Sequence, residues 1–148
     1  METGPEGGLY VLDWHDADIC GEDVVHKETG RIYRITPKKS LAENWAGRYD
    51  DLNSKSDIVL AQLQTSKSVW HARRARLILQ YRASKGKINA AAVAHLKGLF
   101  AKGNVDNRLR AMWALHVTQS LSETELSKAL NDNEEYIRAW AVQLLSEN

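Results

Sequence analysis

Apolar side chains recur every three or four positions from Asp57 onward, and this spacing predicts a series of amphipathic helices. Gly86 and Gly103 follow two of these segments, as expected of residues that end a helix. Ser122 and Glu125 have the S-x-x-E spacing of a capping box, which predicts the start of another helix. We therefore expect six helices, over residues 57–63, 69–84, 89–102, 106–118 and 123–130, and from 133 to the last residues.

An Arg-Ala pair occurs three times within these helices, as Arg74-Ala75, Arg110-Ala111 and Arg138-Ala139. The pairs are 36 and 28 residues apart, within the range of roughly 20 to 50 residues that stacked helical repeats occupy. Each pair lies on the second helix of a predicted hairpin, which is apolar over more of its circumference, as expected of a helix buried between repeats. The sequence predicts a mainly α fold, a HEAT-like α-solenoid of about three helical hairpins over residues 57–148. We expect the three arginines to form a ladder in which each bonds carbonyls or carboxylates of the preceding layer.

Residues 1–36 have a β pattern instead. A turn at Gly4–Gly8 precedes the β-rich segment Leu9–Leu12, which continues into Asp13, and a second such segment follows at Arg31–Ile35. Two strands alone are marginal in water, because three or more are usually needed to bury an apolar face. The predicted β-hairpin therefore requires partner strands, and we expect the chain to be a fragment of a larger protein.

Residues 37–56 connect the two patterns and are rich in Lys, Asn, Asp and Ser, which is typical of a linker. Leu41, Trp45 and Tyr49 recur every four residues within this segment and make it a candidate for a short helix.

The composition is that of an ordinary globular protein, with 43% hydrophobic and 26% charged residues. A net charge of +1 gives no global electrostatic reason to expect nucleic acid or an anionic membrane as a partner. No apolar run approaches the ~20 residues of a membrane-spanning helix, and the acidic, Gly-rich N-terminus differs from a secretory signal. Cys20 is the only cysteine, so the chain contains no disulfide framework and no C-x-x-C-H motif for haem attachment.

Three segments occur in a particular order: GPEGGLYV from Gly4, DWHD from Asp13 and TGRIYRIT from Thr29. Together they resemble the last blade of the β-propeller in the large membrane-bound dehydrogenases of planctomycetes and verrucomicrobia. Those propellers are similar to soluble quinoprotein glucose and sorbosone dehydrogenases. In that family the propeller is followed by HEAT-like repeats and then by a c-type cytochrome domain. The order of propeller end, linker and helical repeats covers the whole of this chain.

The resemblance implies a periplasmic or membrane-associated oxidoreductase as the parent protein, with a c-type haem and with a quinone as a further candidate cofactor. This chain lacks most of the propeller and the haem domain, so we expect neither a cofactor nor turnover in this chain alone. Its role would be that of a connector whose partners are the remaining propeller blades and the haem domain. The alternative is a free-standing HEAT-repeat module that binds a protein partner on the solenoid surface.

Acidic and imidazole side chains crowd the loop after the first strand, and such groups are ligands for divalent cations. The candidate metal ligands are Asp13, His15, Asp16 and Asp18, followed in the same loop by Cys20, Glu22, Asp23 and His26. Their spacing matches neither an EF-hand nor a zinc site. A loop in which the Asp residues form turns and bond the backbone is the favoured interpretation. A place on the loop face of a propeller, near substrate or cofactor, is the remaining alternative.

A basic run in the second predicted helix and its loop could contact phosphate: Arg73, Arg74, Arg76, Arg82, Lys85 and Lys87. The net charge is only +1, and no aromatic residue interleaves with the run beyond Trp70. A solvated face that pairs with acids such as Asp106 or Glu134 is therefore favoured over nucleic-acid binding. The five tryptophans are expected to pack in the core.

Overall fold

The computed structural model describes residues 1–13, 30–36 and 47–147. The chain divides into two compact units, Met1–Tyr49 and Asp50–Asn148. The first contains a small antiparallel sheet and the second contains all the described helices, so the protein is mainly helical.

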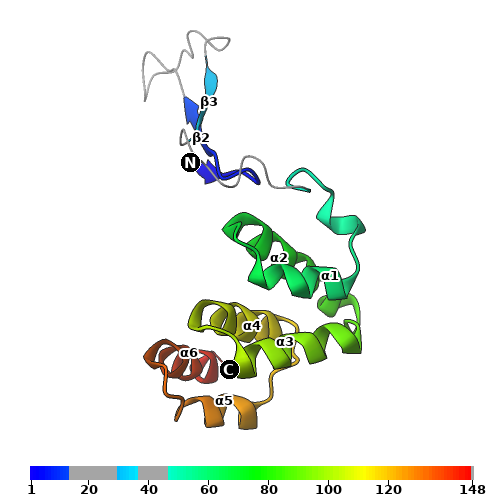
Figure 1. Ribbon diagram of the computed structural model, residues 1–148, viewed down its shortest axis with the longest axis vertical. Helices are drawn as coiled ribbons and strands as arrows, with labels where there is room; N and C mark the ends of the chain where they lie inside the picture. The colour runs from blue at the N-terminus through cyan, green and yellow to red at the C-terminus, as the bar shows by residue number, and fades with distance from the viewer. Residues whose placement is uncertain (14–29, 37–46, 148) are drawn as a thin grey trace, which may run out of the picture. The chain divides into compact units, whose positions relative to one another are not determined.

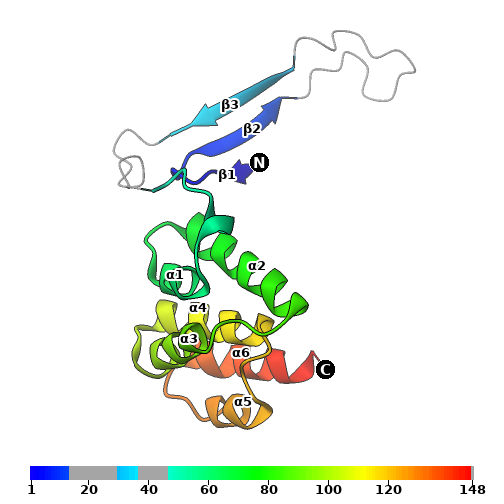
Figure 2. The ribbon, with the colours of Figure 1, turned by 90° about the vertical axis from the view of Figure 1, so that its right-hand side faces the viewer.

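The sheet has three strands, β1 (Glu2–Thr3), β2 (Leu9–Asp13) and β3 (Arg31–Ile35), in the order β1-β2-β3. Figure 2 shows β2 and β3 running in opposite directions. In their pairing, Leu9 lies opposite Ile35 and Asp13 lies opposite Arg31. The two predicted strands are thus confirmed, and β1 is an addition to the predicted hairpin. It forms because the turn after it, closed by the Gly4 N–H donating to the Gly8 carbonyl at 2.8 Å, brings the first residues back along β2. Gly7 has φ 82°, a conformation that favours glycine.

Several apolar side chains of the sheet face solvent. Leu12, Ile32 and Ile35 are 75%, 69% and 57% exposed. The buried side chain is Glu6, which accepts a hydrogen bond of 2.5 Å from the Tyr10 hydroxyl and lies 3.4 Å from the Arg34 guanidinium. Among the described residues, every buried hydrophobic side chain lies between residues 52 and 144, in the helical unit.

Six α-helices make up the second unit: α1 (Asp57–Gln62), α2 (Val69–Lys85), α3 (Ala90–Lys102), α4 (Val105–Val117), α5 (Glu123–Ala129) and α6 (Glu135–Ser146). Short 3-10 helices, Leu52–Ser54 and Leu63–Thr65, precede and follow α1. Each predicted helix is confirmed, with ends shifted by one or two residues. The starts follow from capping chemistry: Ser122 and Glu125 form the predicted capping box, and the side chain of Asn104 accepts from the Asn107 N–H at 2.9 Å.

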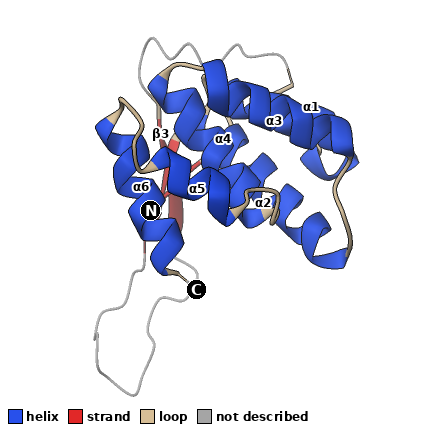
Figure 3. Cartoon of the chain, turned by 90° about the horizontal axis from the view of Figure 1, so that it is seen from below, coloured by secondary structure: helices blue, strands red, loops and turns tan. Residues whose placement is uncertain are grey.

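The helices pack as three successive pairs, α1 with α2, α3 with α4, and α5 with α6 (Figure 1). The pairs stack, because α1 contacts α3, α2 contacts α4 and α4 contacts α6. Helices α2, α4 and α6 therefore form one layer, and Figure 3 shows the unit along the stack. Leu60, Leu79, Leu96 and Leu115 fill the core of the first two pairs, and Met112 joins the core of the third.

A buried alanine marks the same place on each helix of this layer, but the third one is not the predicted residue. Ala75 lies seven residues after the N-cap Ser68, and Ala111 lies seven residues after the N-cap Asn104; both are fully buried. On α6 the corresponding residue is Ala141, seven residues after Glu134, and it is also fully buried. The prediction that Arg138-Ala139 completes the series is wrong, because both residues are exposed.

The segment between the two patterns is described from residue 47. Leu41 and Trp45 of the candidate short helix lie outside the described residues, and Tyr49 lies in a turn. Leu52 belongs to the helical unit, where it is 5% exposed and packs in the core.

Candidate binding groove on one helical layer

The predicted arginine ladder is present at one of its three positions. Arg110 on α4 donates to the carbonyls of Ser66 at 2.8 Å and Gln64 at 3.3 Å, which follow α1 in the preceding pair. Arg138 instead donates to the carbonyls of Asp132 and Asn133 in the loop before its own helix. Arg74 is exposed. Arg110 thus stabilises the stacking of two pairs, whereas Arg138 only closes a local turn.

A second arginine of α4 joins the later pairs. Arg108 donates from Nε to the Phe100 carbonyl at 2.8 Å and from both terminal nitrogens to the Asp132 carboxylate. This two-point contact is the strong form of an arginine–carboxylate pair. The Arg108 hydrogen bonds hold the pKa of Asp132 below its usual value, against a smaller opposing effect of burial.

Asp57, at the first residue of α1, joins three elements. Its carboxylate accepts from Arg82 on α2 at 2.6 Å and from the backbone N–H of Asn89 before α3 at 2.8 Å. Burial raises the pKa of Asp57, but the hydrogen bonds from Asn89 and Arg82 outweigh it, so the pKa is lowered. The acid that pairs with this part of the basic run is therefore Asp57, not the expected Asp106 or Glu134.

Arg76, on α2 and in the same basic run, lies beside a pair of tryptophans on α4 and α6, the other two helices of this layer. Its guanidinium carbon lies 5.1 Å from the centre of the Trp113 ring on α4, within the range of a cation–π contact. Trp113 in turn meets Trp140 on α6 edge to face, with ring centres 5.0 Å apart at 71°. The three side chains come from three successive helices of one layer.

A cavity of about 330 Å³ lies along these side chains. We call it the tryptophan groove, defined by Arg76, Trp113, His116, Val117, Trp140, Leu144 and Glu147. Near one part of it, His116 Nε2 lies 3.3 Å from the Glu147 carboxylate. The groove therefore combines a cation, an acid and apolar surface across all three helix pairs.

Two donors at the groove have no acceptor. Arg76 Nη1 and Trp113 Nε1 are buried and lack a hydrogen-bond partner among the described residues. Burial, and then the neighbouring charges of Arg73 and Arg110, lower the pKa of Arg76. A buried donor without a partner costs about 1–3 kcal/mol, so native proteins rarely leave one without a reason. An anionic or carbonyl oxygen is the kind of group that could accept hydrogen bonds from these two donors.

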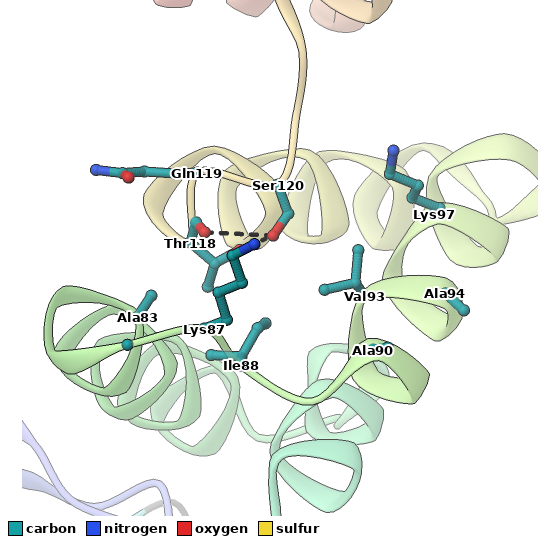
Figure 4. Close-up of a pocket in the computed structure, with 11 residues that line it drawn as sticks. Ala83, Lys87, Ile88, Ala90, Val93, Ala94, Lys97, Thr118, Gln119 and Ser120 are labelled. Atoms are coloured by element: carbon teal, nitrogen blue, oxygen red, sulfur yellow. Dashed lines mark hydrogen bonds between the residues drawn. The ribbon is translucent and has the colours of Figure 1, made fainter.

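A larger cleft of about 660 Å³ lies between the end of α2, α3 and the loop after α4. Lys87, Ile88 and Val93 point into it (Figure 4). Two of its polar side chains are already engaged: the Thr118 hydroxyl donates to the Ala114 carbonyl at 2.7 Å, and Lys97 pairs with Glu125. The cleft therefore offers space and apolar surface but no unpaired buried donor, and we take the tryptophan groove as the stronger candidate.

Sequence reasoning missed this groove. The tryptophans were expected in the core, and Trp70 and Trp140 do pack against it, although both are only partly buried. Trp113 and Trp140 also line the groove, and Trp14 and Trp45 lie outside the described residues. Arg76 and Trp113 are 37 residues apart in the sequence, and only the stacking of α2 on α4 brings them together. The available signal was that both lie about two turns into the second helix of their pairs.

The predicted metal loop is not visible in full. Asp13 ends β2, while His15, Asp16 and Asp18 lie outside the described residues. Elsewhere, in the parts of the chain that the structure describes, no three His, Cys, Asp or Glu side chains come together as a metal site would require.

These features define a mainly helical protein with stacked helix pairs and a small antiparallel sheet. Comparison with known proteins finds no matching family model, no similar curated protein and no similar solved structure. Within the described residues, none of the helices combines the length and the apolar character needed to cross a bilayer.

Proposed function

We propose that this chain is a non-catalytic scaffold, a HEAT-like solenoid of three helix pairs that connects other modules of a multidomain dehydrogenase. The observation that supports a scaffold role is a repeated buried position within one layer of helices. Ala75, Ala111 and Ala141 are fully buried at the same distance from their N-caps. Small side chains at that place let neighbouring helices approach closely. Such a stack supplies a shaped surface, and Arg108 and Arg110 hold successive pairs together.

The sheet supports the connecting role. Leu12, Ile32 and Ile35 are largely exposed, and three short strands with exposed apolar side chains are a poor independent fold. Additional strands packed on this sheet would bury those side chains, as the blades of a propeller do for each other. This proposal makes the sheet the last blade of a dehydrogenase propeller in a periplasmic or membrane-associated parent that carries c-type haem.

The tryptophan groove favours a second candidate function, a free-standing module that binds a protein partner. Buried donors without a partner only cost stability in a connector, whereas in a binding module a ligand can supply the acceptor. The two functions share the helical scaffold and differ in whether the chain is covalently part of an oxidoreductase.

The test is the full reading frame of the gene together with an activity assay. We expect further propeller blades upstream, a C-x-x-C-H motif downstream, helical circular dichroism from the chain and no dye-linked oxidation of sugars or alcohols by the chain alone. An isolated gene that encodes only this chain would favour the binding module. Turnover by the purified chain would refute the non-catalytic role in both versions.

A further inference from the structure

We propose that the tryptophan groove binds an acidic segment of a partner protein. A carboxylate of that segment would accept hydrogen bonds from Arg76 and the Trp113 indole, and a neighbouring apolar side chain would lie against Trp140 and Leu144. This inference rests on the helical scaffold proposed above, and it is independent of the link to a dehydrogenase.

The first step is the missing acceptor. Arg76 Nη1 and Trp113 Nε1 are both buried donors without a partner among the described residues, and the guanidinium lies 5.1 Å from the indole ring. A carboxylate has two oxygens with about four acceptor sites, so one group can satisfy both donors. Hydrogen bonds to charged groups contribute roughly 1.5–3 kcal/mol each, more than bonds between neutral groups.

The second step is the surrounding charge. Burial lowers the pKa of Arg76, and the neighbouring positive charges of Arg73 and Arg110 lower it further. The Nη1 of Arg110 already donates to two backbone carbonyls. An anionic group at Arg76 would relieve the repulsion among the three cations, whereas a neutral peptide would leave it in place.

The third step separates a peptide from a nucleic acid. The rest of the lining is apolar at Val117, Trp140 and Leu144. Its two polar residues, His116 and Glu147, lie 3.3 Å from each other. The net charge of +1 provides no broad basic surface for the repeated phosphates of a nucleic acid. A volume of about 330 Å³ suits one or two side chains rather than a polymer groove. A single carboxylate next to an apolar side chain matches the donors of Arg76 and Trp113 and the apolar surface of Trp140 and Leu144.

The experiment is binding of the full chain to an array of short peptides. The array contains peptides with Asp or Glu next to Leu, Phe or Met, the same peptides with Asn or Gln in place of the acids, and phosphoserine and single-stranded RNA probes. The strongest peptide is then measured by fluorescence anisotropy. We expect retention of acidic peptides over their amide counterparts by about tenfold or more, the effect of one charged hydrogen bond.

Matched variants locate the site. Arg76→Gln should weaken binding of the strongest acidic peptide about tenfold or more, and Trp113→Phe, which keeps the ring but removes the N–H, should weaken it several-fold. Arg74→Gln removes the same charge from an exposed position of the same helix and should change binding less than about twofold. All three variants are checked by far-UV circular dichroism.

Other results overturn the proposal. Equal retention of acidic and amide peptides, binding that survives Arg76→Gln, or a preference for the phosphate probes would each contradict a carboxylate at Arg76. A circular dichroism spectrum without helical signal for the unsubstituted chain would instead contradict the helical scaffold. Failure of the binding proposal and failure of the scaffold proposal are therefore distinguishable.

Discussion

The position of Ala141 provides the most direct test of how the helix pairs stack. Ala141 is fully buried in the cluster that contains Met112, Ile137 and Leu144, whereas Ala139, two residues earlier on the same helix, is exposed. Leucine adds three carbon atoms at either position. At Ala141 these atoms have no space, and overpacking of this kind typically costs 1–3 kcal/mol. At Ala139 they face solvent, and since Ala and Leu are both good helix formers we expect a change within about 0.5 kcal/mol.

The assay is equilibrium unfolding in urea, followed by far-UV circular dichroism, of the unsubstituted chain, Ala141→Leu and Ala139→Leu. We expect a lower midpoint for Ala141→Leu with an unchanged slope, which indicates lost stability rather than altered compactness. Ala139→Leu is the matched control because the substitution, the helix and the added volume are the same. A loss for Ala139→Leu as large as that for Ala141→Leu would refute the register of α6 against α4.

Three further results follow from the contacts of individual side chains. Ser122→Ala removes the N-cap of α5 and should lower the free energy of unfolding in urea by about 1 kcal/mol. Ser122 also donates to Glu125, whose pKa is lowered to about 2 by hydrogen bonds from Lys97 and Ser122. Asp57→Ala should cost about 2 kcal/mol at pH 7. Because folding lowers the pKa of Asp57, its contribution to stability is complete above about pH 4 and is lost as the pH falls further. The difference in unfolding free energy between Asp57→Ala and the unsubstituted chain should therefore shrink in acid. A difference that stays constant with pH would contradict this. Arg76→Leu should leave the unfolding midpoint unchanged or raise it, while binding of acidic peptides is lost; a clear drop in the midpoint would make Arg76 a structural residue.

The helices were predictable because their signals are local. Apolar spacing, glycine ends and the Ser122 capping box each act within one or two turns, and all six helices lie where these signals place them. The pairing of β1 with β2 was harder to predict, because β1 is only two residues long and forms through the turn that follows it.

The error in the repeat has a physical cause. The recurring Arg-Ala pair follows residue type, whereas burial follows the distance from the start of the helix. The N-caps of α2, α4 and α6 are Ser68, Asn104 and Glu134, so the second interval is 30 residues rather than the 28 of the Arg-Ala pairs. A shift of two residues turns a helix by about 200°, which carries Ala139 from the core to the surface.

The groove could not be predicted because its parts are distant in sequence and their roles depend on what surrounds them. Arg76 was one cation in a basic run, and nothing local distinguishes it from Arg82, which pairs with Asp57. Only the stacking of α2 on α4 places Arg76 against Trp113. Long-range packing is therefore what separates the cation available for binding from the cation used for folding.

Four of the arginines in this unit differ in a way that supports that distinction. Arg108, Arg110 and Arg138 each donate to backbone carbonyls in loops or at the end of a helix, where the helix geometry leaves such carbonyls without partners. These contacts satisfy groups that folding would otherwise leave unpaired, so the three side chains contribute to stability. Arg76 lies in the middle of α2, where the helix has no free carbonyls, and it contacts an aromatic ring while a buried nitrogen lacks an acceptor. Burial of Arg76 costs free energy and satisfies no neighbouring group. A ligand that supplies the missing acceptor would explain why this cation is buried.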